Sequence, residues 1–259
     1  MNQQEFLNIA TFNVRGPCDA APYNWENRRD RVREIFKICQ LHLCGMQEPF
    51  KMQINDIIAD SRYAYIGNGR DDFKDQGEHS CIIYDTVRLT LLDHGTFGLS
   101  ESPDVPGVRS WNSAHPRIAT WGRFKDNLSG KELIVYNTHL DDISELARVN
   151  GIKMLVAHAR KHAAGVPMFL EGDFNAFPDS ETYKIAAGLL HDSRAVSETP
   201  HKGPEKTFHG YGRDSVEDAP IDYIFVTEDI RVYSHETVDM KPGGVFASDH
   251  YPLVIQVSL

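Results

Sequence analysis

The stretch PMFLEGDFNAFPDS, residues 167–180, governs the interpretation of the whole chain, because an apolar run typical of a buried strand ends in polar side chains. Asp173 and Asn175 close that run, and burying a carboxylate or a carboxamide without a partner costs several kcal/mol. A site for a metal ion or a reacting group at the end of the strand accounts for both residues. Glu171, inside the run, is expected to be only a neighbour of that site.

Strands and helices alternate on both sides of this stretch. Residues that alternate between apolar and polar predict strands, and apolar spacings of three and four predict amphipathic helices. The expected strands are residues 6–14, 43–48, 63–69, 79–85, 87–97, 117–124, 132–140, 166–173, 221–226, 229–240 and 252–259. The expected helices are residues 24–42, 52–58, 142–159 and 180–190, the third beginning with a capping-box pattern at Asp142. Because neighbouring strands often lack a helix between them, the pattern predicts mixed sheets covered by helices.

Length and composition favour one domain over residues 1–259, since the chain is 41% hydrophobic and contains no low-complexity linker. No apolar stretch approaches the roughly 20 residues that a membrane-spanning helix needs, and no basic or apolar surface segment predicts membrane binding. Four cysteines without zinc spacing indicate reduced structural residues. With no signal-peptide pattern at the N-terminus, this predicts a cytoplasmic protein, although a signal peptide already removed would leave the same sequence.

The charge balance limits the class of partner. The formal net charge is −10, and a protein that binds long nucleic acid through phosphates normally has a clustered basic surface. The only dense basic cluster, Arg28, Arg29, Arg31 and Arg33, is interleaved with acidic residues, which favours a solvated helix face. Tight nonspecific duplex binding is therefore disfavoured, whereas a short strand or a small phosphate ester is not.

Polar side chains with metal or phosphate chemistry recur at the ends of the expected strands. They are Asn13, Glu48, His139, Asp173, Asn175, Asp222, Asp249 and His250. Each has an ordinary explanation: backbone bonding in turns for the Asn and Asp residues, a favourable charge before a helix for Glu48, and a core or surface position for the histidines. Ligands of α/β proteins bind where strand ends converge, so the recurrence itself predicts an acidic, oxygen-rich pocket with two imidazoles.

The motifs TFNVR, QE, NTHLD, GDFNA, IDYIFV and SDHYPL resemble, in this order, those of the endonuclease/exonuclease/phosphatase superfamily. That superfamily includes deoxyribonucleases, abasic-site endonucleases, sphingomyelinases, inositol polyphosphate 5-phosphatases and deadenylase-like enzymes. The resemblance extends from Asn13 to His250. GEHS, GTFGLSE and PRIATW further resemble a bacterial branch near the deadenylase-like members, although His79 stands where Tyr is expected in that branch.

This resemblance implies a four-layer α/β sandwich, with two mixed β-sheets packed face to face and helices outside. It implies Mg²⁺, with Mn²⁺ as a substitute, held by Glu48 with the help of Asn13. The other roles it implies are activation of the nucleophile by Asp173 and Asn175, phosphate contact by His250 paired with Asp249, support by Asp222, and a second phosphate-contacting or proton-donating group at His139. Arg117 and His79 are weaker candidates for phosphate or substrate binding. Hard oxygen ligands suit Mg²⁺, and no His/Cys cluster has zinc spacing.

The expected function is metal-dependent hydrolysis of a phosphate ester by in-line attack of an activated water, with a phosphodiesterase as first choice. The alternative is a 3′-to-5′ exonuclease or an endonuclease on single-stranded RNA or DNA. Tyr211, Phe208 and Trp111 are aromatics that would stack on bases, although surface or core positions are the simpler explanation for each. A catalytically silent binding module would require a lost metal or histidine position, and none is lost. The oligomeric state is left open.

Overall fold

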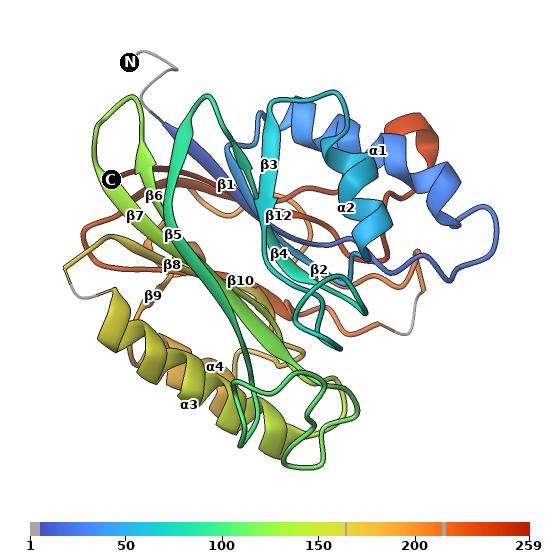
Figure 1. Cartoon of the computed structure of the whole chain (residues 1–259). Coiled ribbons are helices and arrows are strands. Elements are labelled where there is room, and N and C mark those ends of the chain that lie inside the picture. The colour runs from blue at the N-terminus through green and yellow to red at the C-terminus, as the bar shows by residue number, and fades with distance from the viewer. Residues whose placement is uncertain (1–5, 164, 214–215) are drawn as a thin grey trace.

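The computed structural model describes residues 6–163, 165–213 and 216–259, which form two six-stranded β-sheets (Figure 1). The expectation about a signal peptide rests in part on residues 1–5, which lie outside the described residues. The first sheet has the order β11-β12-β1-β2-β4-β3 and consists of β1 (Leu7–Asn13), β2 (Leu43–Gln47), β3 (Tyr63–Ile66), β4 (Ser80–Asp85), β11 (Arg231–Thr237) and β12 (Leu253–Ser258). The second has the order β5-β6-β7-β8-β10-β9 and consists of β5 (Leu89–Gly98), β6 (Ile118–Asp126), β7 (Glu132–His139), β8 (Met168–Asp173), β9 (His191–Asp192) and β10 (Asp222–Val226).

Both sheets are mixed, as the sequence predicts. β1 pairs with β2 and β7 with β8 in parallel, whereas the other pairings are antiparallel. Helices α1 (Trp25–Ile38) and α2 (Lys51–Ile58) cover the outer face of the first sheet, and α3 (Glu145–His162) and α4 (Glu181–Ala187) that of the second (Figure 1). A short helix, α5 (Ser193–Val196), and a 3₁₀ turn, η1 (Pro242–Gly244), complete the elements. The predicted four-layer α/β sandwich is confirmed.

Alternation along the strands explains the layers. In β1, Leu7 and Ile9 belong to the apolar core between the sheets, whereas Ala10 and Phe12 pack against α1 and α2. Successive side chains of a strand point to opposite faces, so one strand contributes to two cores. No helix in the described part of the chain is both long enough and apolar enough to cross a membrane.

Two predictions about the helices were wrong. The N-cap of α3 is Ser144, whose side chain accepts a hydrogen bond from the Ala147 N–H, while Asp142 instead accepts one from the Arg117 guanidinium. Arg28 does not belong to a solvated face, because it is fully buried. Its guanidinium donates to the backbone carbonyls of Val14, Arg15, Gly16, Tyr23 and Ala247.

Candidate active site

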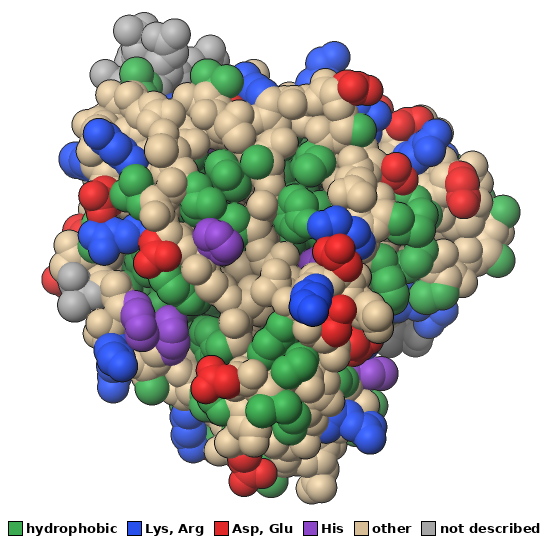
Figure 2. All heavy atoms as spheres, in the orientation of Figure 1, with side chains coloured by type: hydrophobic (Ala, Val, Ile, Leu, Met, Phe, Trp, Pro, Cys, Tyr) green, Lys and Arg blue, Asp and Glu red, His purple; other side chains and the backbone are tan. Residues whose placement is uncertain are grey.

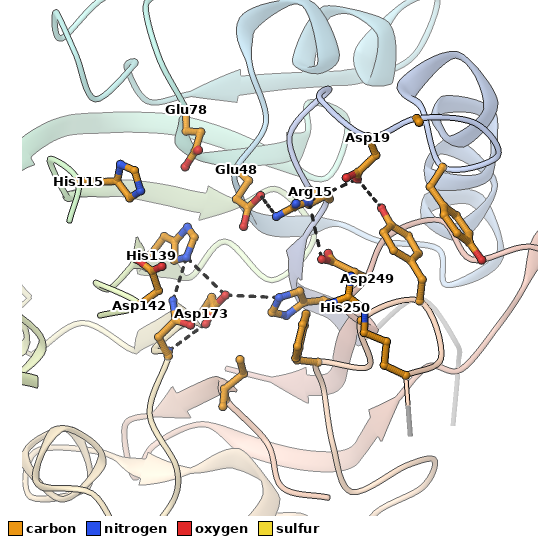
Figure 3. Close-up of a pocket in the computed structure, with 18 of the residues that line it drawn as sticks. Arg15, Asp19, Glu48, Glu78, His115, His139, Asp142, Asp173, Asp249 and His250 are labelled. Atoms are coloured by element: carbon orange, nitrogen blue, oxygen red, sulfur yellow. Dashed lines mark hydrogen bonds and ion pairs between the residues drawn. The ribbon is translucent and has the colours of Figure 1, made fainter. Parts of the chain in front are cut away.

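The carboxyl ends of the parallel strand pairs of both sheets meet at one edge of the sandwich. β1 ends at Asn13, β7 at His139 and β8 at Asp173, and β10 begins at Asp222 directly opposite Asp173. A cavity of about 790 Å³ opens at this edge (Figure 3). Of the predicted residues, those that line it are Glu48, Arg117, His139, Asp173, Asn175, Asp249 and His250. Asn13 and Asp222 lie buried directly behind that lining.

Asn13 links the two sheets at the site. Its Nδ2 donates to Glu48 Oε1 at 3.0 Å and to Asp173 Oδ2 at 3.0 Å, and the residue is fully buried. Glu48 follows β2 in a left-handed conformation with a φ of 68°, and its Oε2 accepts from the Gly16 N–H. A non-glycine residue in this region is strained, and such strain concentrates at functional sites. Two carboxylates from different sheets are therefore fixed side by side.

His250 connects Asp173 with a second carboxylate. Its Nδ1 lies 2.9 Å from Asp222 Oδ2, and its Nε2 lies 3.7 Å from Asp173 Oδ2. Burial acts against the imidazolium, but the carboxylates of Asp222 and Asp173 outweigh it and raise the pKa of His250 to about 10. The sequence predicted Asp249 as the partner of His250; the structure shows Asp222 there, while Asp249 lies 3.8 Å from the Arg15 guanidinium.

Asp173 is a buried carboxyl group whose pKa is raised by its surroundings. Burial and the nearby Asp222 raise the pKa of Asp173 to about 7, and the His250 imidazolium opposes that shift. The backbone N–H of Asn175 donates to Asp173 Oδ1, which fixes the carboxyl group relative to the loop that follows β8. Asp173 is thus a group that exchanges a proton near neutral pH, as a general base does.

His139 and Asn175 complete the centre of the cavity. His139 Nε2 lies 3.0 Å from Asn175 Nδ2 and 3.5 Å from Asp173 Oδ2 (Figure 3). Burial, followed by the Arg117 guanidinium and His250, lowers the pKa of His139 well below its ordinary value, so the ring is neutral. A neutral ring whose Nε2 accepts from Asn175 suits hydrogen bonding to substrate better than proton donation.

Arg117 belongs to one flank of the cavity that the sequence revealed only in part. Its guanidinium is bonded to Asp142 at 2.8 Å, and beside it Arg70 is bonded to Glu78 at 2.5 Å. Burial raises the pKa of Glu78 to about 6, although the Arg70 charge opposes that shift. Arg70 and Glu78 lie on the loop between β3 and β4, where no periodic pattern marked them.

His79 is a predicted substrate-binding residue that the structure does not bring into the cavity lining. It is buried, pairs with Gly69 in an isolated bridge and contacts the Gly77 carbonyl through Nδ1. Its neighbour Glu78 lines the cavity instead. Adjacent residues of extended chain point to opposite sides, so a shift of one residue decides which side chain reaches the site.

The opposite flank adds residues to which no predicted role was given, Arg15 and Asp19 among them, to Tyr211 and Phe208, which were base-stacking candidates. Arg15 lies 3.3 Å from Asp19, 3.7 Å from Glu48 and 3.8 Å from Asp249 (Figure 3). Tyr211 and Phe208 line the cavity, whereas Trp111 is not part of its lining. The signal for this flank was present in two motifs, TFNVR and the Gly-Tyr-Gly turn at residues 210–212.

The donor set fits a hard divalent cation. Asp173, Asp222 and His250 have ligand atoms within 4.8 Å of one another, but Asp222 Oδ2 and His250 Nδ1 already bond each other. Glu48 and Asp173 offer carboxylate oxygens at the open cavity, and Mg²⁺ needs only one or two carboxylates because it keeps several waters. We therefore favour the Glu48 side of the cluster over the Asp222 side as the place of the ion.

Comparison with known proteins agrees with this geometry. The profile of the Endonuclease/Exonuclease/phosphatase family matches residues 10–250. The endonuclease/exonuclease/phosphatase from Bacteroides vulgatus superposes with a TM-score of 0.93 at 34% identity, with 98% of this chain and 99% of that chain covered. The mannosyl-6-phosphatase of Bacteroides thetaiotaomicron superposes with a TM-score of 0.90 at 30% identity, with 98% and 100% covered.

More distant relatives extend the comparison to animals. Nocturnin of Drosophila melanogaster is 23% identical over 288 residues, which cover 93% of this chain and 43% of that protein. The chain spans about half the length of the curated relatives it matches. The family profile and the bacterial structures confirm the resemblance that the motifs indicated.

Enzymes of the matched family hydrolyse phosphate esters and typically use a divalent metal ion. Here the match covers most of the described chain, and the acidic cluster lies at the edge where both sheets contribute strand ends. The chain therefore belongs to the endonuclease/exonuclease/phosphatase family.

Proposed function

We propose that this protein is a divalent-metal-dependent hydrolase of phosphate esters that uses water as its nucleophile. The observation that carries the proposal is the two hydrogen bonds that Asn13 Nδ2 donates to Glu48 and Asp173. They hold the two carboxylates side by side, and the His250 imidazolium lies 3.7 Å from Asp173. A phosphate ester needs such a combination, because negative charge must be neutralised while water loses a proton nearby.

Each residue of the site has a separate role in this hydrolysis. Glu48, with Asn13 beside it, would hold Mg²⁺, with Mn²⁺ as a substitute, and the bound ion would polarise a phosphoryl oxygen. Asp173 accepts the proton of the attacking water, and the new bond from water oxygen to phosphorus forms as the bond to the leaving oxygen breaks. Asn175 orients the water, and His250, held by Asp222, donates to a phosphoryl oxygen. The leaving oxygen takes its proton from solvent at the cavity mouth.

A small-molecule ester is favoured over nucleic acid. The net charge is −10, and Figure 2 shows acidic and basic side chains intermingled on the face it presents. A phosphodiester is the first choice from the sequence. A phosphomonoester is the second candidate, because a structural neighbour at 30% identity is named a mannosyl-6-phosphatase. Single-stranded RNA or DNA is the third, supported by Phe208 and Tyr211 in the cavity lining.

One set of assays separates these functions. Purified protein with Mg²⁺ or Mn²⁺ is offered bis(p-nitrophenyl) phosphate, p-nitrophenyl phosphate and a short single-stranded RNA. Asp173→Ala serves as the blank, and Asp229→Asn, which changes an exposed carboxylate outside the cavity, is the matched control. We expect turnover of a small ester that Asp173→Ala abolishes and Asp229→Asn retains.

Each outcome has a distinct meaning. Faster cleavage of the diester than of the monoester supports a phosphodiesterase, and the reverse supports a phosphatase. RNA shortened by the wild type but not by Asp173→Ala would make the nuclease the leading function. No turnover of any substrate with either ion would refute the hydrolase and favour a binding module.

A further inference from the structure

One wall of the cavity contains groups that the proposed chemistry does not use. Asp19, Tyr23 and Tyr211 form this tyrosine wall. The two rings stack with centroids 3.9 Å apart and planes inclined by 14°, and Tyr211 donates its hydroxyl to Asp19 Oδ2 at 2.9 Å. All three residues line the cavity, and Asp19 lies on the far side of Arg15 from Asp173 (Figure 3). A molecule bound at the phosphate site therefore meets aromatic carbon and a carboxylate on this side.

The tyrosine wall is held rigidly. Arg28 donates to the backbone carbonyls of Arg15, Gly16 and Tyr23, which fixes the loop that connects β1 with α1. Tyr211 adopts a left-handed conformation with a φ of 61° between two glycines that also have positive φ. Preorganised groups lose little conformational freedom on binding, so they can discriminate between ligands rather than merely adapt to them.

Asp19 can accept a further hydrogen bond from a ligand. Asp19 Oδ2 accepts from Tyr211 and is also the oxygen nearest Arg15, whereas Oδ1 has no hydrogen-bond donor among the residues that the structure describes. A carboxylate oxygen at a cavity surface accepts hydrogen bonds from hydroxyl groups. Aromatic rings beside it pack against the apolar C–H surface of the same ligand.

The carboxylates near this wall disfavour a second phosphate beside Asp19. On the opposite flank Arg70 is bonded to Glu78, and Arg117 to Asp142. At the wall itself the guanidinium of Arg15 is shared among three carboxylates. A phosphate beside Asp19 would meet these carboxylates while the Arg15 charge is already shared, which is unfavourable, although Arg213 also lines the cavity.

We infer that the tyrosine wall is a subsite for an uncharged, polyhydroxylated organic group, such as a sugar ring, that leaves from the phosphate. The inference rests on the proposed function and adds to it the class of leaving group and the residues that select it. Hydroxyl groups of the leaving group donate to Asp19, and its C–H surface packs on Tyr23 and Tyr211. A site built to bond a hydroxyl rejects an analogue without one far more strongly than an apolar pocket rejects an extra methylene.

The test compares two esters with the same reacting group. kcat/KM is measured with Mg²⁺ for a hexose 6-phosphate and for butyl phosphate, which lacks hydroxyl groups. We expect the wild type to prefer the hexose ester by about 100-fold or more. Tyr211→Leu should reduce that preference by about tenfold, through KM for the hexose ester, and Tyr211→Phe, which keeps the ring stacking, should lose less. Tyr233→Leu, which removes a ring on β11 outside the cavity lining, is the matched control and should keep the wild-type preference.

The failures of the two proposals are distinguishable. If both esters are hydrolysed with similar kcat/KM, or if Tyr211→Leu leaves their ratio unchanged, the subsite is refuted while the hydrolase stands. If neither ester is turned over, calorimetric binding of the same two esters to the same proteins decides. A preference for the hexose ester that Tyr211→Leu reduces would support the subsite without the proposed activity, and equal affinities would overturn it.

Discussion

At the scale of single residues, Asp222 keeps the imidazole of His250 protonated and therefore positively charged. Asp222 is buried at the start of β10, its Oδ2 bonds His250 Nδ1, and its Oδ1 has no partner among the described residues. Because this carboxylate is the main cause that keeps the imidazole protonated, its removal must lower the pKa of His250.

Asp222→Asn should therefore move the basic limb of the pH–kcat/KM profile to lower pH. The imidazolium persists in the wild type up to a pKa of about 10, and without Asp222 it deprotonates earlier, so activity falls more at pH 8.5 than at pH 6.5. We expect a loss of about 10- to 100-fold at the higher pH. Steady-state profiles of the wild type, Asp222→Asn and the exposed control Glu228→Gln are the measurement. An unshifted basic limb would show that His250 does not act as the cation.

Glu171 is a buried carboxyl group outside the cavity lining. It is fully buried between the sheets, and burial raises its pKa well above the ordinary value, although the Gly45 backbone opposes that shift. Gly45 makes room for it, since a Cβ there would lie 2.3 Å from Glu171 Oε1. The group is therefore protonated in the folded state at a pH where the unfolded chain has lost the proton.

The Glu171 carboxyl group makes the free energy of unfolding depend on pH. A raised folded pKa stabilises the fold fully below the unfolded pKa of about 4.3, and this stabilisation is lost as pH rises through the folded pKa. In that window the free energy of unfolding of the wild type should fall relative to that of Glu171→Gln, by at most about 1.4 kcal/mol per pH unit. Urea unfolding between pH 5 and 9 measures the difference, with the exposed Glu181→Gln as control. Parallel curves for the wild type and Glu171→Gln would contradict the protonated state.

At the scale of elements, periodicity predicted the sheets and the four main helices, because each has a repeating apolar face. The same reasoning failed where a long-range contact decides. Ser144 caps α3, whereas Asp142 binds Arg117, which directly precedes β6. Glu78 rather than His79 enters the cavity because the path of the β3–β4 loop sets which residue points inward. No local pattern contains that information.

Helix α1 provides the clearest case of a contact that the sequence concealed. In a run of four arginines, only Arg28 is fully buried, where it donates to carbonyls of the loops that contain Arg15 and Asp249. Arg29, its neighbour, is exposed and lies 3.9 Å from Asp30. A planar guanidinium with five donors satisfies several carbonyls at once, and an ammonium group cannot do so in the same geometry.

Arg28→Lys should consequently lower the free energy of unfolding by about 3 kcal/mol, because buried carbonyls lose their donors. Arg29→Lys, the matched change one residue later, should alter it by less than about 0.5 kcal/mol. Guanidinium chloride unfolding followed by circular dichroism measures both. Equal effects of the two substitutions would mean that the Arg28 contacts contribute little to stability.

At the scale of the whole molecule, hydrogen bonds between the two sheets hold the two halves of the site in position. Gln47 Nε2 donates to Asn137 Oδ1 at 2.7 Å, and Asn137 Nδ2 donates to the carbonyls of Met46 and Cys81. Asn13 adds the bond to Asp173 nearer the cavity. The strand ends were predictable as polar positions, but their pairing across sheets was not, because it depends on how the two sheets pack.

A divalent ion at this junction should stabilise the whole fold. Glu48 follows β2 of the first sheet, and Asn13 ties it to Asp173 of the second, so a cation at Glu48 is bound by the folded chain and not by the unfolded one. At a free concentration of 100 times Kd, such binding adds about 2.7 kcal/mol to the free energy of unfolding. Protein freed of metal with EDTA and returned to Mg²⁺ should show a Tm that rises with ion concentration. Glu48→Gln, which keeps the shape and removes the charge, should lose most of that rise, and the exposed Glu236→Gln should keep it. An equal rise in all three proteins would place the ion elsewhere, because a cation held by Glu48 cannot bind with the same affinity when that charge is gone.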